Sequence, residues 1–487
     1  MIKQIKSLLY FPLAYYFRFF ARIQLSIWKP TIIVVTGSSG KTTLLNLIES
    51  QLQKKAKYSH FANSSYGIPF DILGMHRKNL TIEEWPYLFL AAPFRAFKKP
   101  PLEKLYVVEA DCDRPYEGKF LASLLKPNVT LWTNVSRTHT VNFDQLVKNK
   151  DFKTVERAIA HEFSYFLEYT SDLAILNSDD DLIKKESQRS KVQTQNVSQT
   201  NLNSYKVFKD HTQFKINAKD YSIMTLLPKE TSHSIQMTLA LLDYLKIKPD
   251  YSFSSFTLPP GRCRAFKGIK NTTIIDSSYN ATPDGVKSIL GMFNQYPSEK
   301  KWLVLGDMIE LGNEEKEEHE KLADVIASMR LEKVILVGPR LLKYAYPKLK
   351  LFLNCHPELV SGSHSSRFEM PKQVRHDTVQ IETFTMPKEA LDYLLDNLKG
   401  GEVVLFKGAR FLEGIIEHLL ADKNDVKKLC RCEKIWHEVH HEEFLRSLSK
   451  LNALNFSDKY LRMLLRCVLR WNAQLEQLYL FPCLQFF

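Results

Sequence analysis

The sequence predicts an α/β fold built on mostly parallel sheets, and two observations support this prediction. Short apolar runs rich in β-branched residues alternate along the chain with longer helical patterns. Polar residues follow most of these runs directly. Strands of a parallel sheet are buried on both faces and therefore appear as continuous apolar runs, and the helices between them connect one strand to the next.

The first 29 residues form a separate segment that is basic and rich in aromatic residues. The stretch from Ser7 to Phe17 is uncharged, is interrupted by Pro12, and lies between lysines and arginines. Eleven uncharged residues are too few to span a bilayer as a helix, which needs about twenty. Two alternatives stay open: the segment lies in a membrane interface as an amphipathic anchor, or it packs on the surface of its own protein.

A glycine-rich turn follows the first predicted strand, which runs from Thr31 to Val35. Residues 36 to 43 read Thr-Gly-Ser-Ser-Gly-Lys-Thr-Thr, and a helical pattern begins at Leu44. In such a turn, backbone N–H groups and the positive end of the helix dipole point at one position and bind phosphate. We expect Lys41 to be solvated in the loop and to contact phosphate, and Thr42 to provide a hydroxyl for Mg²⁺. The motif predicts nucleoside triphosphate binding, with contacts from Gly37, Ser38, Ser39, Gly40, Lys41, Thr42 and Thr43.

Further apolar runs predict the remaining strands. They are 105–108, 129–132, 173–176, 273–275, 302–305, 333–337 and 403–406. The Pro-Pro-Gly sequence before Arg262 interrupts the alternation, and a second series of strands follows it. We therefore predict a central ATP-binding domain over residues 30–262 and a Rossmann-like C-terminal α/β domain over 263–420. We also expect residues 355–377 to form a polar insertion, because they lack apolar periodicity, and residues 421–487 to form a helical tail.

Composition narrows the class of protein. The apolar fraction of 44% and charged fraction of 25% indicate a folded globular chain. The net charge of +13 suits phosphorylated substrates, because no nucleic-acid-binding motif is present, and we expect no nucleic acid partner. Seven scattered cysteines do not form a disulfide framework and no cleavable signal is visible, so we expect a cytoplasmic location, with peripheral contact at the inner face of the membrane if the first segment is an anchor.

Polar motifs after the predicted strands occur in the order found in one known family. After the phosphate loop come Asn63 to Pro69, Glu109, a Thr-Asn-x-x-x-x-His run ending at His139, and Asp276 to Pro283, which reads Asp-x-x-Tyr-Asn-Ala-x-Pro. The sequence Leu-Gly-Asp-Met-x-Glu-Leu-Gly follows at 305–312, and Lys-Gly at 407–408. Over about residues 30 to 420 the chain resembles the Mur ligases, most closely the branch that adds D-alanyl-D-alanine to a UDP-N-acetylmuramoyl tripeptide.

This resemblance implies an activity and a set of site residues. Such enzymes transfer the γ-phosphoryl group of ATP to a carboxylate, and a free amine then attacks the acyl phosphate. ATP, Mg²⁺, a peptidoglycan precursor and D-alanyl-D-alanine are the implied ligands. The implied catalytic residues are Lys41, Glu109 and His139, and the implied metal ligands are Thr42, Glu109 and His139. Asn134, Arg262, Asp276 and Asn280 are the implied further ATP contacts.

The sequence also departs from the family pattern. We expect the family's first domain, which binds the uridine end of the substrate, to be missing, because the phosphate loop already starts at residue 36. Where the family carries a carbamylated lysine for a second Mg²⁺, this chain has Phe163. Two alternatives therefore remain open: a poly-γ-glutamate-type or other Mur-like amide ligase, and a non-catalytic nucleotide-binding protein.

Overall fold

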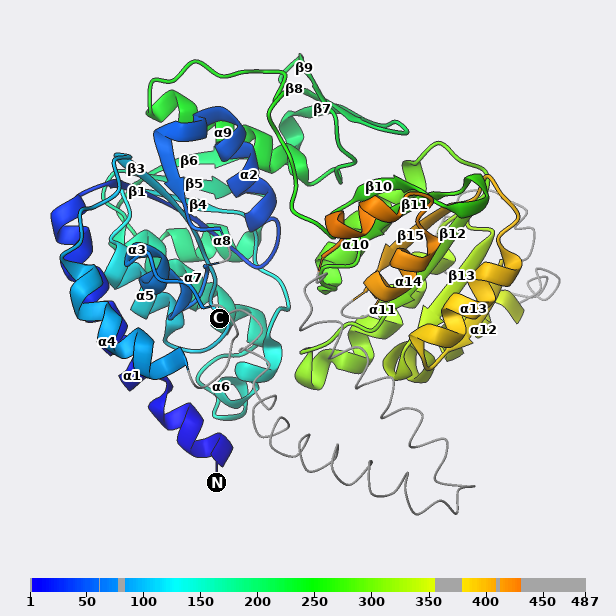
Figure 1. Cartoon of the computed structure of the whole chain (residues 1–487), viewed down its shortest axis with the longest axis horizontal. Helices are drawn as coiled ribbons and strands as arrows, with labels where there is room; N and C mark the ends of the chain where they lie inside the picture. Colours follow the sequence, from blue (N-terminus) through cyan, green and yellow to red (C-terminus); the bar gives the residue numbers. More distant parts are fainter. Residues whose placement is uncertain (1, 61, 78–83, 355–378, 409–411, 431–487) are drawn as a thin grey trace, which may run out of the picture.

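The fold was analysed in a computed structural model, which describes residues 2–60, 62–77, 84–354, 379–408 and 412–430. Two six-stranded sheets lie in separate α/β halves of the molecule, and a small three-stranded sheet lies near the first of them (Figure 1). The predicted α/β class with mostly parallel sheets is confirmed.

The central sheet is parallel throughout, with strand order β2-β3-β1-β4-β5-β6. Its strands are β1 (Thr31–Thr36), β2 (Ala56–Tyr58), β3 (Leu105–Ala110), β4 (Val129–Trp132), β5 (Leu173–Asn177) and β6 (Gln193–Val197). Alternate residues of β1 enter different cores, because successive strand side chains point to opposite faces. Ile33 and Val35 pack towards α2 (Lys41–Leu52) and α9 (Thr231–Tyr244), whereas Ile32 and Val34 pack on the other side.

The helices on that other side build the larger core. They are α1 (Ile2–Trp28), α3 (Gly67–Ile72), α4 (Glu84–Ala96), α5 (Glu117–Leu125), α7 (Val155–Tyr169) and α8 (Asp181–Ser187). Short segments η1 (Gln53–Lys55), η2 (Thr140–Asn142) and α6 (Asp144–Lys148) connect these elements.

Helix α1 contributes a full stripe of this core. Tyr10, Ala14, Phe17, Ala21 and Trp28 recur at helical spacing and are buried. The ring of Phe17 lies 4.8 Å from that of Phe70 in α3, centroid to centroid. The N-terminal segment therefore packs on its own protein, which is one of the two alternatives expected for it. Within the described residues, no helix combines the length and apolarity needed to cross a membrane.

An antiparallel sheet follows the central one in sequence and was not predicted. It consists of β7 (Leu202–Val207), β8 (Thr212–Ile216) and β9 (Lys219–Ile223), and η3 (Gln199–Asn201) precedes it. Phe214, Ile216 and Tyr221 bury one face of it in a small core that includes Leu47 of α2.

The C-terminal sheet has the order β10-β11-β15-β12-β13-β14, and only β10 is antiparallel to its neighbour. Its strands are β10 (Arg264–Lys267), β11 (Thr273–Ser277), β12 (Lys301–Gly306), β13 (Lys333–Val337), β14 (Gln380–Phe384) and β15 (Val403–Lys407). The helical segments around it are η4 (Ile269–Asn271), α10 (Pro283–Gln295), η5 (Gly312–Glu314), α11 (Glu315–Ala327), η6 (Leu341–Ala345), α12 (Tyr346–Asn354), α13 (Pro387–Asn397) and α14 (Leu412–Leu419).

The predicted domain limits stay a prediction, although the boundary near Arg262 does fall between α9 and β10. The insertion at 355–377 lies outside the described residues, as does the tail beyond residue 430. The first part of the tail forms η8 (Lys423–Lys428), and Leu429 is buried against the C-terminal core.

Candidate nucleotide and metal site

The phosphate loop links β1 to α2, and its conformation requires glycine at two positions. Gly37 and Gly40 have φ values of 126° and 78°. A Cβ atom on Gly37 would lie 2.2 Å from Thr133 Oγ1, so a side chain is excluded by contact as well as by conformation. The loop therefore brings the backbone close to the end of β4.

Asn134 fixes the shape of this loop. Its carbonyl accepts a hydrogen bond from Ser38 N at 3.0 Å, and its side-chain Oδ1 accepts one from Ser39 N at 2.8 Å. Its amide group donates to Ser39 Oγ at 2.6 Å. Asn134, a predicted ATP contact, therefore fixes the conformation of the phosphate loop through its hydrogen bonds to Ser38 and Ser39.

Lys41 is buried, which corrects the expectation that it is solvated. Its ammonium group lies 2.7 Å from Asp111 Oδ2 and donates to the carbonyl of Gly37 at 2.6 Å. Burial alone would lower the pKa of Lys41, but the charges of Asp111 and Glu109 outweigh it and raise the pKa. The lysine is therefore fully charged at neutral pH.

Thr42 and Glu109, the two oxygen donors predicted to bind Mg²⁺, lie side by side. Thr42 Oγ1 donates a hydrogen bond to Glu109 Oε1 at 3.2 Å. Burial raises the pKa of Glu109, and the nearby charges of Lys41 and Arg262 oppose that rise. A hydroxyl and a carboxylate are hard oxygen donors of the kind that Mg²⁺ prefers.

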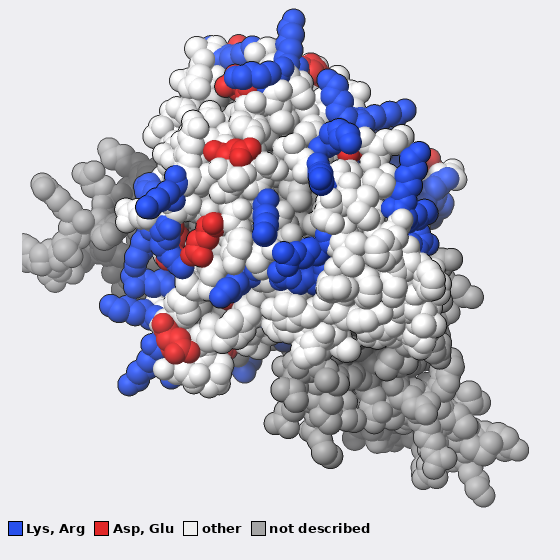
Figure 2. Space-filling model, turned by 90° about the vertical axis from the view of Figure 1, so that its left-hand side faces the viewer, with Lys and Arg blue, Asp and Glu red and all other residues white. Residues whose placement is uncertain are grey.

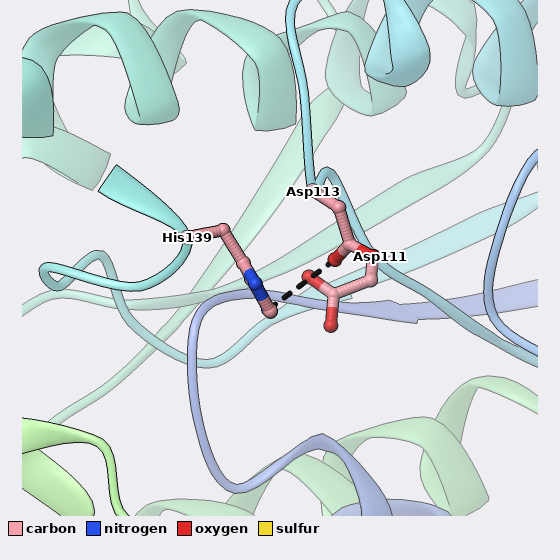
Figure 3. A group of neighbouring side chains, drawn as sticks. All are labelled: Asp111, Asp113 and His139. Atoms are coloured by element: carbon pink, nitrogen blue, oxygen red, sulfur yellow. Dashed lines mark ion pairs between the residues drawn. The ribbon is translucent and has the colours of Figure 1, made fainter. Parts of the chain in front are cut away.

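A second group of donors lies on the loops that follow β3 and β4. Potential ligand atoms of Asp111, Asp113 and His139 lie within 4.8 Å of one another, and Figure 3 shows the imidazole pointing at the two carboxylates. Asp113 Oδ1 is 3.3 Å from His139 Nε2. The sequence singled out His139 but missed Asp113, whose only signal was its place four residues after Glu109 in a strand-end loop.

The charges in this group are strongly coupled. Burial raises the pKa of Asp113 to about 6, with Asp111 adding to the rise and His139 opposing it. Burial would lower the pKa of His139, but Asp113, Glu310 and Asp111 together raise it to about 10. In this state the imidazole is protonated and donates from both nitrogens.

Contacts of His139 and Arg137 join the central domain to the C-terminal domain beside the site. His139 Nδ1 lies 2.8 Å from Glu310 Oε2, in the motif that follows β12. Arg137 Nη1 lies 2.9 Å from Glu314 and 2.8 Å from Glu318, while its Nε contacts Glu156 of its own domain. The histidine loop therefore contacts both domains at once.

The other implied nucleotide contacts lie at the domain junction and at the end of β11. The guanidinium of Arg262 lies 4.4 Å from the ring centre of Tyr279 and close enough to Glu109 to affect its pKa. Asp276 is buried and accepts hydrogen bonds from Ser278 N and Oγ through Oδ1, while its Oδ2 has no partner among the described residues. Asn280 is exposed, and its carbonyl accepts a hydrogen bond from Lys407. Within the described residues, neither Asp276 nor Asn280 bonds to the phosphate loop.

Phe163 occupies the interior of α7. Its side chain is fully buried, with its ring centre 6.1 Å from that of Trp132. No amine is therefore available at this position to form a carbamate.

Fold and site together define a two-domain α/β protein with a phosphate-binding loop at the carboxyl end of a parallel sheet, where ligands of such sheets bind. Sequence models of the Mur ligase middle domain and of the Mur ligase glutamate ligase domain match residues 35–242 and 261–410. The chain therefore belongs to the Mur ligase family.

Similar proteins carry one recurrent name. A UDP-N-acetylmuramoyl-tripeptide–D-alanyl-D-alanine ligase of Rickettsia prowazekii is 26% identical over 406 residues, which cover 78% of this chain and 76% of the relative. The ligase of the same name from Bacillus subtilis is 23% identical over 402 residues, covering 80% and 76%. Among solved structures, the MurF ligase of Thermotoga maritima in complex with ADP has a TM-score of 0.62 at 20% identity, with 85% and 84% of the two chains covered.

Proposed function

We propose that this protein is an ATP- and Mg²⁺-dependent ligase that joins D-alanyl-D-alanine to the terminal carboxylate of a UDP-N-acetylmuramoyl tripeptide. The relatives with this name cover most of the chain, which supports the substrate pair. The single structural observation that carries the proposal is the convergence of Lys41, Thr42 and Glu109 at the phosphate loop.

The proposed chemistry has two steps. An oxygen of the precursor's carboxylate attacks the γ-phosphorus of ATP, the bond to the β-phosphate oxygen breaks, and ADP leaves. The amine of the dipeptide then attacks the acyl carbon, inorganic phosphate leaves, and the amine loses a proton as the amide forms. Both steps bring anionic groups together, so fixed positive charge at the phosphates lowers the barrier.

The chain's own residues fit these demands. Lys41 and the backbone N–H groups of residues 40–43, at the start of α2, would hold the β- and γ-phosphates, while the N–H groups of Ser38 and Ser39 bond to Asn134. Thr42 and Glu109 would hold the Mg²⁺, and Asp111 and Asp113 offer further carboxylate oxygens. His139, a ligand implied by the resemblance, would first have to lose the proton that Asp113 and Glu310 stabilise on it. Bound there, Mg²⁺ would neutralise charge on the transferring phosphoryl group. Because ATP is the phosphoryl donor, we place the activity in the cytoplasm.

ADP release tests the substrate pair. With ATP and Mg²⁺ present, we expect release only when tripeptide precursor and D-alanyl-D-alanine are supplied together, and a product mass equal to the joined dipeptide. Glu109→Gln should remove this activity by weakening the metal site. Glu49→Gln is the matched control, because Glu49 lies on α2 and pairs with His60, away from these donors. ADP release with glutamate or a glutamate polymer, and none with D-alanyl-D-alanine, would instead establish the poly-γ-glutamate alternative.

A further inference from the structure

Large apolar side chains are exposed along α4 and the segment after it. Leu90, Phe94 and Phe97 are 70%, 81% and 71% exposed, and with Tyr87 they follow the outward face of the helix at i, i+3, i+7 and i+10. Leu102, a few residues on, is equally exposed. Leu88 and Ala92, on the opposite face of α4, are buried in the core, so the helix is held with its apolar stripe turned outwards.

Helix α1 extends this surface. Tyr16 donates a hydrogen bond to the carbonyl of Phe89 at 2.8 Å, and the rings of Tyr16 and Phe20 are 5.0 Å apart. Next to them Phe19 and Ile27 are exposed, and Trp28 donates to the carbonyl of Glu103 in the segment after α4. We call this surface the α1–α4 face, and its exposed apolar members are Phe19, Ile27, Leu90, Phe94, Phe97 and Leu102.

The charges around the α1–α4 face are almost all positive. Residues 2–28 contain no acidic residue. Along α4 and the segment after it, residues 84–104, the acids are Glu84, which pairs with Arg77, and Glu103, and the bases are Arg95, Lys98, Lys99 and Lys104. Figure 2 views the side of the molecule on which Figure 1 places α1 and α4, and Lys and Arg there surround open areas of uncharged surface with few acidic side chains between them.

We infer that the α1–α4 face docks on the surface of an anionic lipid bilayer. Phenylalanine and leucine side chains that project from rigid helices enter the acyl boundary, while lysines and arginines at their edge remain with the lipid headgroups. Charge complementarity selects this partner, because the mostly positive rim would repel a second copy of the same face but attracts anionic lipid. The α1–α4 face would then lie in the plane of the membrane interface.

Vesicle co-sedimentation of the full-length protein tests the inference. We expect binding to phosphatidylcholine vesicles that contain phosphatidylglycerol, and little binding to phosphatidylcholine alone. Combining Leu90→Ser, Phe94→Ser and Phe97→Ser should lower the bound fraction about tenfold, as should Lys98→Glu, Lys99→Glu and Lys104→Glu together. These side chains are exposed, so the fold should persist, and ADP release without vesicles should match that of the wild type.

Two control variants carry the same chemical changes on other surfaces. Met224→Ser, Leu351→Ser and Phe352→Ser remove exposed apolar side chains elsewhere. Lys191→Glu, Lys229→Glu and Lys248→Glu make the same change in net charge at exposed positions. Both controls should bind vesicles as the wild type does.

Three results would overturn the inference. The first is equal vesicle binding by the α1–α4 variants and the wild type, and the second is no binding of the wild type to anionic vesicles. The third is a wild-type dimer in sedimentation that the triple serine variant converts to a monomer, which would make the face an interface between copies. Vesicle binding and sedimentation do not depend on ADP release. A negative result in these experiments would therefore reject membrane docking and leave the proposed ligase activity untouched.

Discussion

Lys41 forms an ion pair with Asp111, so a bound phosphate would compete with this carboxylate for the same ammonium group. Their 2.7 Å contact is buried, and removing one partner of a buried ion pair leaves an uncompensated charge. The lysine therefore contributes to stability as well as to the proposed catalysis, which its position in the motif alone did not reveal.

We predict that Lys41→Met abolishes ADP release and also destabilises the fold, by about 3 kcal/mol, because Asp111 is left buried and unpaired. Adding Asp111→Asn should restore most of the lost stability without restoring turnover. Urea unfolding and ADP release on the two variants check both parts. Turnover by the double variant would show that Lys41 is not a phosphate contact.

How far the site could be predicted depends on where each residue lies in sequence. The phosphate loop is contiguous, so its residues were visible as one motif. Glu109 and His139 were found only through family resemblance, because the approach of two separate strand-end loops leaves no local signal. Asp113 was missed for that reason: only the fold places it 3.3 Å from His139.

Among the secondary-structure elements, burial separates the strands that were predicted from those that were not. β1, β4 and β12 are almost wholly buried and appear as apolar runs. The edge strand β6 reads Gln-Thr-Gln-Asn-Val, with four exposed residues, and β14 is half-exposed along most of its length. An edge strand pairs with a neighbour on one side only and needs few apolar residues, so it shows no apolar pattern in the sequence by which it could be predicted. The antiparallel sheet β7–β9 is also largely polar on one face.

The insertion connects α12 to β14, an edge strand of the C-terminal sheet, and this position suggests that it can be removed. We predict that replacing residues 355–377 by a short glycine linker leaves ADP release nearly unchanged, since shortening a loop between surface elements costs little free energy. Activity and melting temperature of the deletion variant provide the check. Loss of folded protein would show that the segment has a structural role.

On the scale of the whole molecule, Arg137 holds the two domains against each other. Its guanidinium contacts Glu156 in the central domain, and Glu314 and Glu318 in the C-terminal domain. Exposed ion pairs alone contribute little, but here several carboxylates surround one partly buried cation. Glu310 contacts His139 at 2.8 Å in the same region, so the ion pairs of Arg137 also support this contact beside the site.

We predict that Arg137→Met lowers kcat about tenfold while the KM for ATP changes little, because the phosphate loop is intact and only closure is weakened. Arg189→Met is the matched control: Arg189 pairs with Glu168 and Glu186 within one domain. Steady-state kinetics and small-angle scattering should separate the two variants. If the two variants lowered kcat equally, the ion pairs between the domains would not be the cause of the loss.

Helix α1 packs against residues far along the chain, so it is synthesised long before its last packing partners. Arg18 of this helix bonds to the carbonyl of Phe120, 102 positions later in the chain. At a translation rate of about 5–20 residues per second, the helix leaves the ribosome on the order of ten seconds before that partner exists. Early in this interval its core stripe has no partner, because Tyr10 and Phe17 pack against Tyr66 and Phe70, and Trp28 packs against Tyr106, all of which are made later. The nascent chain therefore passes through a period in which a chaperone, or a nearby bilayer, competes with the protein's own core for its first helix.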